Sequence, residues 1–269
     1  MNLYITLFAI LAFITGASFA SFAGVIAFRI PKGMSIVAPD SFCPECKKPI
    51  KFYDNIPILS WIFLGGKCRY CKEKIPVFSF VNEILGGFGF MLAYFQYGNS
   101  KKLLPLLVAI ILLTFLFLII AAIDYETHDI YNITLIIFAI ISIFITTYRV
   151  FFLGSNIWDH LIGSVFGFGF FASVKLISKI KLKKEGLGAG DVYIVGIAGL
   201  MLGVIPLVLS ILIGSLLALI VEPIKAKGFR LSENEIAFAP YLLLGIETMA
   251  LFGDVFMNYY WKVIINVFL

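Results

Sequence analysis

The chain of 269 residues is 61% hydrophobic and only 14% charged, and its mean hydropathy is +1.02. A soluble domain of this size needs more charge on its surface, so the composition excludes a soluble globular protein and predicts an integral membrane protein. The net charge of +5 calls for no nucleic-acid partner, because basic residues collect in the cytoplasmic loops of membrane proteins.

Apolar runs of about 20 residues predict an all-α polytopic protein with about eight transmembrane helices. The first run has no basic segment before it and no A-x-A cleavage pattern, so we expect a retained helix and not a signal peptide. Gly203 and Pro206 divide two later runs, although a proline inside an apolar run can also kink a single helix. The predicted spans are 3–28, 77–98, 103–123, 131–153, 157–178, 189–204, 206–223 and 236–257.

The positions of Lys and Arg orient these spans. With the loop 29–76 in the cytoplasm, 17 of the 21 basic residues lie in cytoplasmic segments, and only Lys101, Lys102, Arg149 and Lys262 lie outside. This bias predicts an N-terminus outside the cell. It also predicts that the third span ends, and the sixth span begins, at the cytoplasmic face.

All four cysteines lie in the loop 29–76, as two C-x-x-C pairs. Cys43 pairs with Cys46 and Cys68 with Cys71, and 21 residues separate the pairs. Four thiolates at this spacing suit a tetrahedral Zn²⁺. Disulfides are the competing interpretation, but they rarely persist in the reducing cytoplasm. We therefore expect a structural zinc that folds a loop too poor in apolar residues to fold alone.

Two carboxylates lie at the ends of two predicted spans. Asp124 follows the third run, and Asp191 ends the glycine-rich stretch 186–191 at the start of the sixth. If both face the cytoplasm, they can share a proton and hold a water between them, as in aspartic proteases. The glycines allow close approach to an extended substrate. Taken alone, Asp124 also suits an ordinary polar turn.

Three other polar residues near helix ends have ordinary interpretations. We expect His128 to be a solvated loop residue, because no second His or Cys lies near it in the sequence. Asp159 and His160 stand at the outer start of the fifth span, where we predict a capping role.

Taken together, these residues resemble the bacterial type IV prepilin peptidases, which are membrane aspartic proteases with a G-x-G-D motif. The resemblance runs nearly end to end, through the segments 17–31, 43–46, 53–61, 68–71, 82–83, 123–125, 188–192 and 239–241. The chain departs from the family pattern at Tyr131, where Pro is usual, at Tyr193, where Lys is usual, and at Ala237 and Ala239, in a stretch usually richer in Pro and Gly.

The resemblance implies that Asp124 and Asp191 are catalytic, and that the protein cleaves the short basic leader of prepilins and pseudopilins, usually after a Gly. It also implies methylation of the new N-terminus with S-adenosylmethionine, although no glycine-rich cofactor loop stands out. The expected parts are a first transmembrane helix (1–28), a cytoplasmic four-cysteine loop (29–76) and a helix bundle with the protease site (77–269). The expected location is the inner membrane, with the aspartates at its cytoplasmic face.

Two other functions remain open at this point. One is a peptidase without methyltransferase activity, as in the related preflagellin peptidases, which generally lack the four-cysteine loop. The other is a non-enzymatic membrane scaffold or transporter whose loop recruits a partner. The second alternative requires no pair of acids on one face of the membrane.

Overall fold

The computed structural model describes residues 3–182, 187–225 and 237–268. Gly186 of the glycine-rich stretch and four residues of the predicted basic loops, Lys183, Lys184, Lys227 and Arg230, lie outside these ranges. Within them the protein is helical and contains no strand, which confirms the predicted all-α class. The α-helices are α1 (Leu3–Arg29), α2 (Leu59–Phe63), α3 (Val77–Tyr97), α4 (Leu104–Thr127), α5 (Asn132–Leu153), α6 (Ile157–Leu182), α7 (Ala189–Leu202), α8 (Val204–Lys225) and α9 (Ala239–Phe268).

Seven of the described helices are long and apolar enough to cross a membrane. The predicted span 189–204 is instead the 14-residue helix α7, which is about 21 Å long and too short for a hydrocarbon core of about 30 Å. The prediction of eight full spans is therefore corrected to seven and one short apolar helix. α7 ends at Gly203, because a φ of +83° lies outside the helical range. Residues with a side chain rarely adopt this φ, and glycine permits it.

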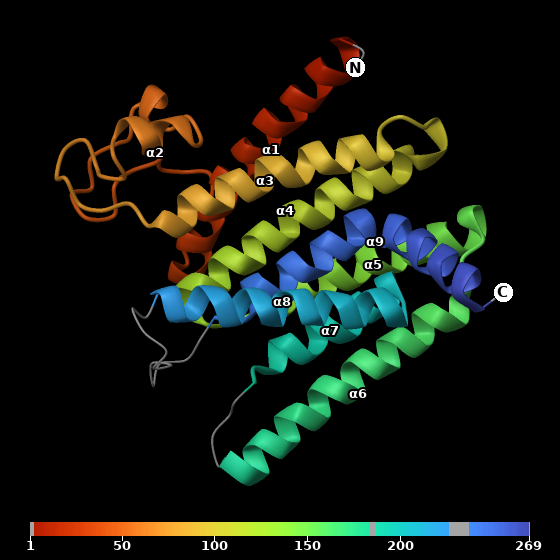
Figure 1. Cartoon of the computed structure of the whole chain (residues 1–269). Coiled ribbons are helices and arrows are strands. Elements are labelled where there is room, and N and C mark those ends of the chain that lie inside the picture. The colour runs from red at the N-terminus through yellow and green to blue at the C-terminus, as the bar shows by residue number, and fades with distance from the viewer. Residues whose placement is uncertain (1–2, 183–186, 226–236, 269) are drawn as a thin grey trace. The chain divides into compact units, whose positions relative to one another are not determined.

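The chain divides into two compact units, and α4 contributes residues to both. The first unit comprises Met1–Leu107 and Thr114–Thr127. In it α1 and α3 run side by side (Figure 1), with Gly16 against Gly86. A Cβ on Gly16 would lie 2.1 Å from the Gly86 carbonyl oxygen, so small residues let the two backbones touch.

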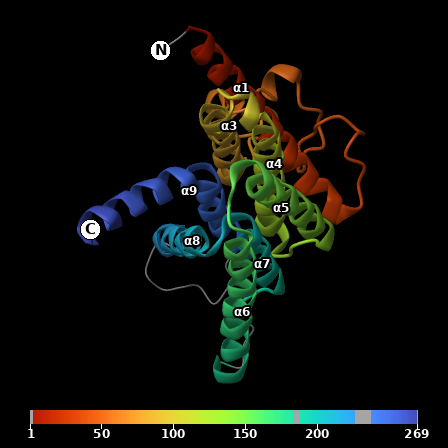
Figure 2. The ribbon, with the colours of Figure 1, turned by 90° about the vertical axis from the view of Figure 1, so that its right-hand side faces the viewer.

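The second unit comprises Val108–Leu113 and His128–Leu269. Here α7 packs along α6 (Figure 2), and the contact again depends on glycine, since a Cβ on Gly199 would lie 2.2 Å from the Gly163 carbonyl oxygen. Ile194, Val195 and Ala198 of α7 are completely buried. The short helix that begins at the G-x-G-D motif is thus enclosed by its neighbours, which fixes the position of Asp191.

Candidate functional site

Asp191 lies in the first turn of α7, three residues after the N-cap Gly188, and only 7% of its surface is exposed. Gly188 has an ordinary φ of −62°, so space and not backbone conformation explains the glycines here. A Cβ on Gly188 would lie 3.3 Å from the Asp191 Oδ2 atom, and a Cβ on Gly190 would lie 2.6 Å from the Ile130 side chain. The motif therefore packs the chain closely at the N-terminus of α7, where Asp191 lies.

Asp124 lies in the last turn of α4 and is also buried, with 6% of its surface exposed. The next residue, Tyr125, stacks its ring on Phe78 of α3 with centroids 4.2 Å apart, which holds this end of α4. His128 and Asp129, just beyond the helix, are exposed. The predicted solvated position of His128 is confirmed. Asp124 is buried, whereas the nearby Asp129 is exposed. The two buried aspartates belong to different units.

The four cysteines converge. Their Sγ atoms all lie within 4.8 Å of one another, and the Sγ atoms of Cys43 and Cys71 are 3.8 Å apart. Sulfurs placed tetrahedrally about 2.3 Å from a zinc ion are themselves separated by about 3.8 Å, so this donor set fits such a metal. All four thiols are free of disulfides. The predicted grouping of the cysteines is confirmed, and the four thiols could bind a metal ion.

The two cysteine pairs are built as matching backbone turns. In the first, the Cys43 N–H donates to the Lys48 carbonyl and the Lys47 N–H donates back to the Cys43 carbonyl. The second repeats both bonds 25 positions later, from Cys68 to the Glu73 carbonyl and from Lys72 back to the Cys68 carbonyl. Lys47 and Lys72 both adopt positive φ, of 58° and 62°. The two turns also share the sequence pattern C-x-x-C-K-x-x-I, in which Lys47 matches Lys72 and Ile50 matches Ile75.

The electrostatics of the second turn favour a thiolate at Cys68. Hydrogen bonds from the backbone N–H groups of Cys71 and Tyr70 lower the pKa of the Cys68 thiol to about 6. The Glu73 N–H favours the Cys71 thiolate, but desolvation and the other three cysteines outweigh it and raise the pKa of Cys71 to about 11. A cluster in which one cysteine is already a thiolate before any metal binds is suited to binding a cation.

Two contacts hold the rest of the loop. The Arg69 guanidinium forms a two-pronged ion pair with Asp54, with nitrogen–oxygen distances of 2.6 and 2.5 Å, and this hydrogen bonding lowers the pKa of Asp54. The Ile58 N–H donates to the Glu83 Oε2 atom of α3 at 2.6 Å. Sequence reasoning gave Glu83 no role. The signal that could have identified it is a carboxylate six residues inside an apolar run.

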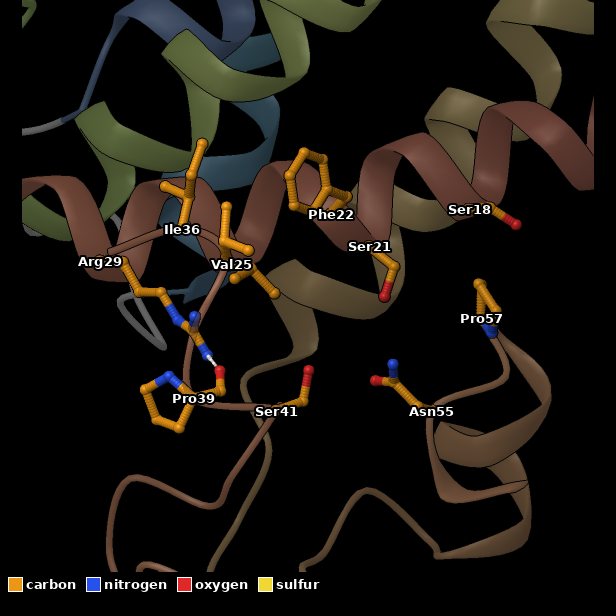
Figure 3. Close-up of a pocket in the computed structure, with 11 residues that line it drawn as sticks. Ser18, Ser21, Phe22, Val25, Arg29, Ile36, Pro39, Ser41, Asn55 and Pro57 are labelled. Carbon is orange, nitrogen blue, oxygen red and sulfur yellow. Dashed lines mark hydrogen bonds between the residues drawn. The ribbon is translucent and has the colours of Figure 1, made fainter. Parts of the chain in front are cut away.

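A cavity of 260 Å³ lies between α1 and the following loop (Figure 3). Arg29, which is 3% exposed, forms one end, with its guanidinium bonded to the carbonyls of Ser35, Pro39 and Asp40. Ser21 and Asn55 lie on opposite sides of the opening. The buried arginine therefore shapes the wall. The lining residues are Ser18, Ser21, Phe22, Val25, Arg29, Ile36, Val37, Pro39, Ser41, Asn55 and Pro57.

The structure corrects the predicted roles of Asp159 and His160. Asn156 receives the hydrogen bond from the Trp158 N–H at the start of α6. Asp159 instead accepts from the Val204 N–H, at the start of α8, and His160 bonds to the Leu200 carbonyl near the end of α7. Both residues therefore serve the α7–α8 junction, which could not be foreseen because it is more than 40 residues away.

Comparison with known proteins gives matches in both parts of the chain. Residues 14–97 match the model of the bacterial peptidase A24 N-terminal domain, and residues 110–222 match that of the type IV leader peptidase family. A prepilin leader peptidase/N-methyltransferase of Bacillus subtilis is 30% identical over 251 residues, which cover 93% of this chain and 96% of the relative. A relative of the same name from Myxococcus xanthus is 34% identical, covering 73% of this chain and 56% of the relative. No solved structure matches.

The apolar helices and these matches define a multi-pass protein of the bacterial inner membrane. More specifically, the chain belongs to the type IV leader peptidase family. Asp124 and Asp191 both fall within the matched range 110–222, and all four cysteines fall within 14–97.

Proposed function

We propose that this protein is an aspartic endopeptidase that removes the leader peptide of type IV prepilins and pseudopilins, and that it then methylates the new N-terminus. The observation that best supports peptidase activity is the burial of two carboxylates at helix ends. Asp124 is 6% exposed and Asp191 is 7% exposed. Buried carboxylates in a membrane protein are costly and mark functional sites. Family membership and the names of the relatives support the substrate class and the methyl transfer.

The proposed chemistry needs one aspartate ionised and the other protonated. The ionised carboxylate takes a proton from a water molecule as the water oxygen attacks the scissile carbonyl carbon, while the protonated carboxyl donates its proton to the carbonyl oxygen. The tetrahedral intermediate then collapses, the C–N bond breaks, and the leaving amine takes up a proton. No covalent enzyme intermediate forms.

We assign the metal of the four-cysteine cluster as Zn²⁺ with a structural role, because four thiolates close its coordination shell and leave no position for water. The methyl donor is S-adenosylmethionine, as the methyltransferase names of the relatives suggest. The proposed membrane arrangement puts the N-terminus outside, the loop 29–76 in the cytoplasm and both aspartates at the cytoplasmic face. The functional parts are then the first helix (1–28), the zinc loop (29–76) and the protease bundle (77–269).

The test is a cleavage assay on the purified full-length protein with a prepilin substrate and a radiolabelled methyl donor. Asp124→Asn and Asp191→Asn should each reduce the cleavage rate at least about 10³-fold, because a pair that shares a proton cannot work with one carboxyl. Asp129→Asn is the matched control, since Asp129 is close in sequence but exposed, and we expect a mild effect. Substantial cleavage by either of the first two variants would remove that residue from the site.

The same assay separates the alternatives. Cleavage without incorporation of label would identify a peptidase only. Absence of both activities in the unchanged protein would favour a non-enzymatic scaffold. The complete four-cysteine loop argues for the full two-step function, because the related preflagellin peptidases generally lack that loop.

A further inference from the structure

The short helix α2 exposes an apolar face within the basic loop. Leu59, Ile62 and Phe63 are 49%, 53% and 83% exposed, and their spacing of three and four residues places them on one side of the helix. The opposite side faces the protein, where Trp61 stacks on Phe80 of α3 with ring centroids 4.5 Å apart. Large apolar side chains displayed together on a loop mark an interaction surface.

Two contacts set the level of α2 along the membrane-spanning helix α3. Phe80 lies three residues, and Glu83 six residues, after the first residue of α3, Val77. These positions correspond to about 4.5 and 9 Å along the helix axis. Because Trp61 stacks on Phe80 and the Ile58 N–H bonds to Glu83, α2 lies beside the first two turns of α3. α3 has 21 residues and is about 31 Å long, so these turns fall in the boundary region of the bilayer.

The orientation of α2 is fixed on both sides. Ile58, directly before it, adopts a φ of +65°, which is strained for a β-branched residue and is held by the bond to Glu83. After α2 the chain turns back through Gly65 and Gly66, at φ of +60° and +66°. A Cβ on Gly66 would lie 2.8 Å from the Trp61 ring, so the turn packs tightly beneath the indole. The apolar face is therefore held outward and cannot simply rotate inward.

The charge of the loop indicates what covers this face. Residues 29–76 contain nine basic side chains and four acidic ones, a net charge of +5. Lys67, four residues after Phe63, is exposed. An exposed apolar face in a loop of net positive charge is typical of segments that lie in the interface of a membrane with anionic lipids.

We propose that α2 is an interfacial wedge, whose residues Leu59, Ile62 and Phe63 insert among anionic lipids beside the start of α3. The wedge ties the four-cysteine loop to the membrane surface, so that the loop does not swing freely on its two chain connections. The lipid is recognised by two chemistries, burial of apolar side chains and attraction of phosphate headgroups to lysine.

Photo-crosslinking of the full-length protein in phosphatidylglycerol-containing nanodiscs tests this proposal. The photoreactive residue p-benzoyl-phenylalanine replaces Phe63 in one variant and Glu45 in the control. Glu45 is exposed but lies in the first cysteine turn, away in sequence from α2. We expect lipid adducts at position 63 at a yield about tenfold higher than at position 45. In nanodiscs of phosphatidylcholine alone, the yield at position 63 should fall.

Two outcomes would overturn the proposal. One is equal and low lipid labelling at positions 63 and 45, which would place the face in water. The other is an adduct at position 63 with added prepilin in place of lipid, which would make the face a docking site for the apolar segment of the substrate. The aromatic replacement at position 63 is conservative, and unchanged prepilin cleavage verifies that the variant is folded.

Discussion

Thr146 and His160 bond to the same backbone oxygen, the carbonyl of Leu200 near the end of α7. The Thr146 Oγ1 donates at 2.7 Å, and the His160 ring binds through Nδ1 at 3.0 Å. The last carbonyls of a helix have no partner within the helix. Since α7 ends inside the protein, side chains from α5 and α6 supply the partners that water or further helix would otherwise provide. This end of the helix that carries Asp191 is therefore held by two neighbouring helices.

Thr146→Val should lower the free energy of unfolding by about 1 kcal/mol, because it keeps the shape and removes one buried donor. It should also slow prepilin cleavage, since α7 positions Asp191. Thermal unfolding in detergent and the cleavage assay measure the two effects. Thr146→Ser keeps the hydroxyl and is the control. If Thr146→Val and Thr146→Ser unfold at the same temperature, the shared carbonyl contributes no stability.

Gly16→Ala should destabilise the first unit by about 1–3 kcal/mol, as overpacked sites do. The new methyl group would need the space of the Gly86 backbone, which lies 2.1 Å away from the Cβ position. Gly24→Ala lies in the same helix with nothing within 4 Å of the added Cβ, and it should be neutral or slightly stabilising. Equal melting temperatures of the two variants would contradict the close contact of α1 and α3.

Cys68 should be alkylated faster than Cys71 at neutral pH in protein stripped of metal. A lowered pKa means that the thiolate, which is the reactive form, appears at lower pH. With a pKa of about 6, the Cys68 rate should rise through pH 6 and level off above it, whereas Cys71, with a pKa of about 11, should remain slow up to pH 9. Mass spectrometry of the labelled peptides measures both rates. A faster reaction at Cys71 would reverse the assignment of the thiolate.

Replacing all four cysteines with Ser should abolish metal binding and reduce methyl transfer more than cleavage. The proposed metal would stabilise the fold of the loop, whereas the proposed protease aspartates lie on α4 and α7. Elemental analysis should give one zinc per unchanged chain and none for the variant. If the variant methylates a pre-cleaved pilin normally but no longer cuts the precursor, the loop serves substrate capture and the division of labour is reversed.

The sequence was sufficient for features that depend on local composition and spacing. Apolar runs predicted the eight long helices of the described chain, although α9 runs to Phe268 and not to the predicted end at 257, and the C-x-x-C pairs predicted that the four thiols meet. The predicted segment 189–204 ends within two residues of α7, but α7, with 14 residues, is too short to be the full span that was predicted. Whether two runs form two spans or one span and a shorter helix depends on backbone conformation at a single residue.

The features that sequence reasoning missed are contacts between distant residues. Asp159 bonds to Val204, which is 45 positions away, and Glu83 bonds to Ile58, which is 25 positions away. For Asp159 the sequence offered a local interpretation, a cap on its own helix, and for Glu83 it offered no role. The folded chain provides a competing partner instead. A carboxylate inside an apolar run was nevertheless a usable signal that some partner must exist.

A metal ion bound by the four-cysteine cluster would close part of the loop into a ring. A metal held by the two pairs would join Cys46 to Cys68 and enclose residues 47–67 between them. Asn55 and Pro57 of the cavity wall and the whole of α2 lie inside this ring. Closing a segment of this length removes much of its freedom in the unfolded chain. A single ion would thus restrain part of the cavity wall and α2 together. Loss of the ion would increase the conformational freedom of both, without any change to their own residues.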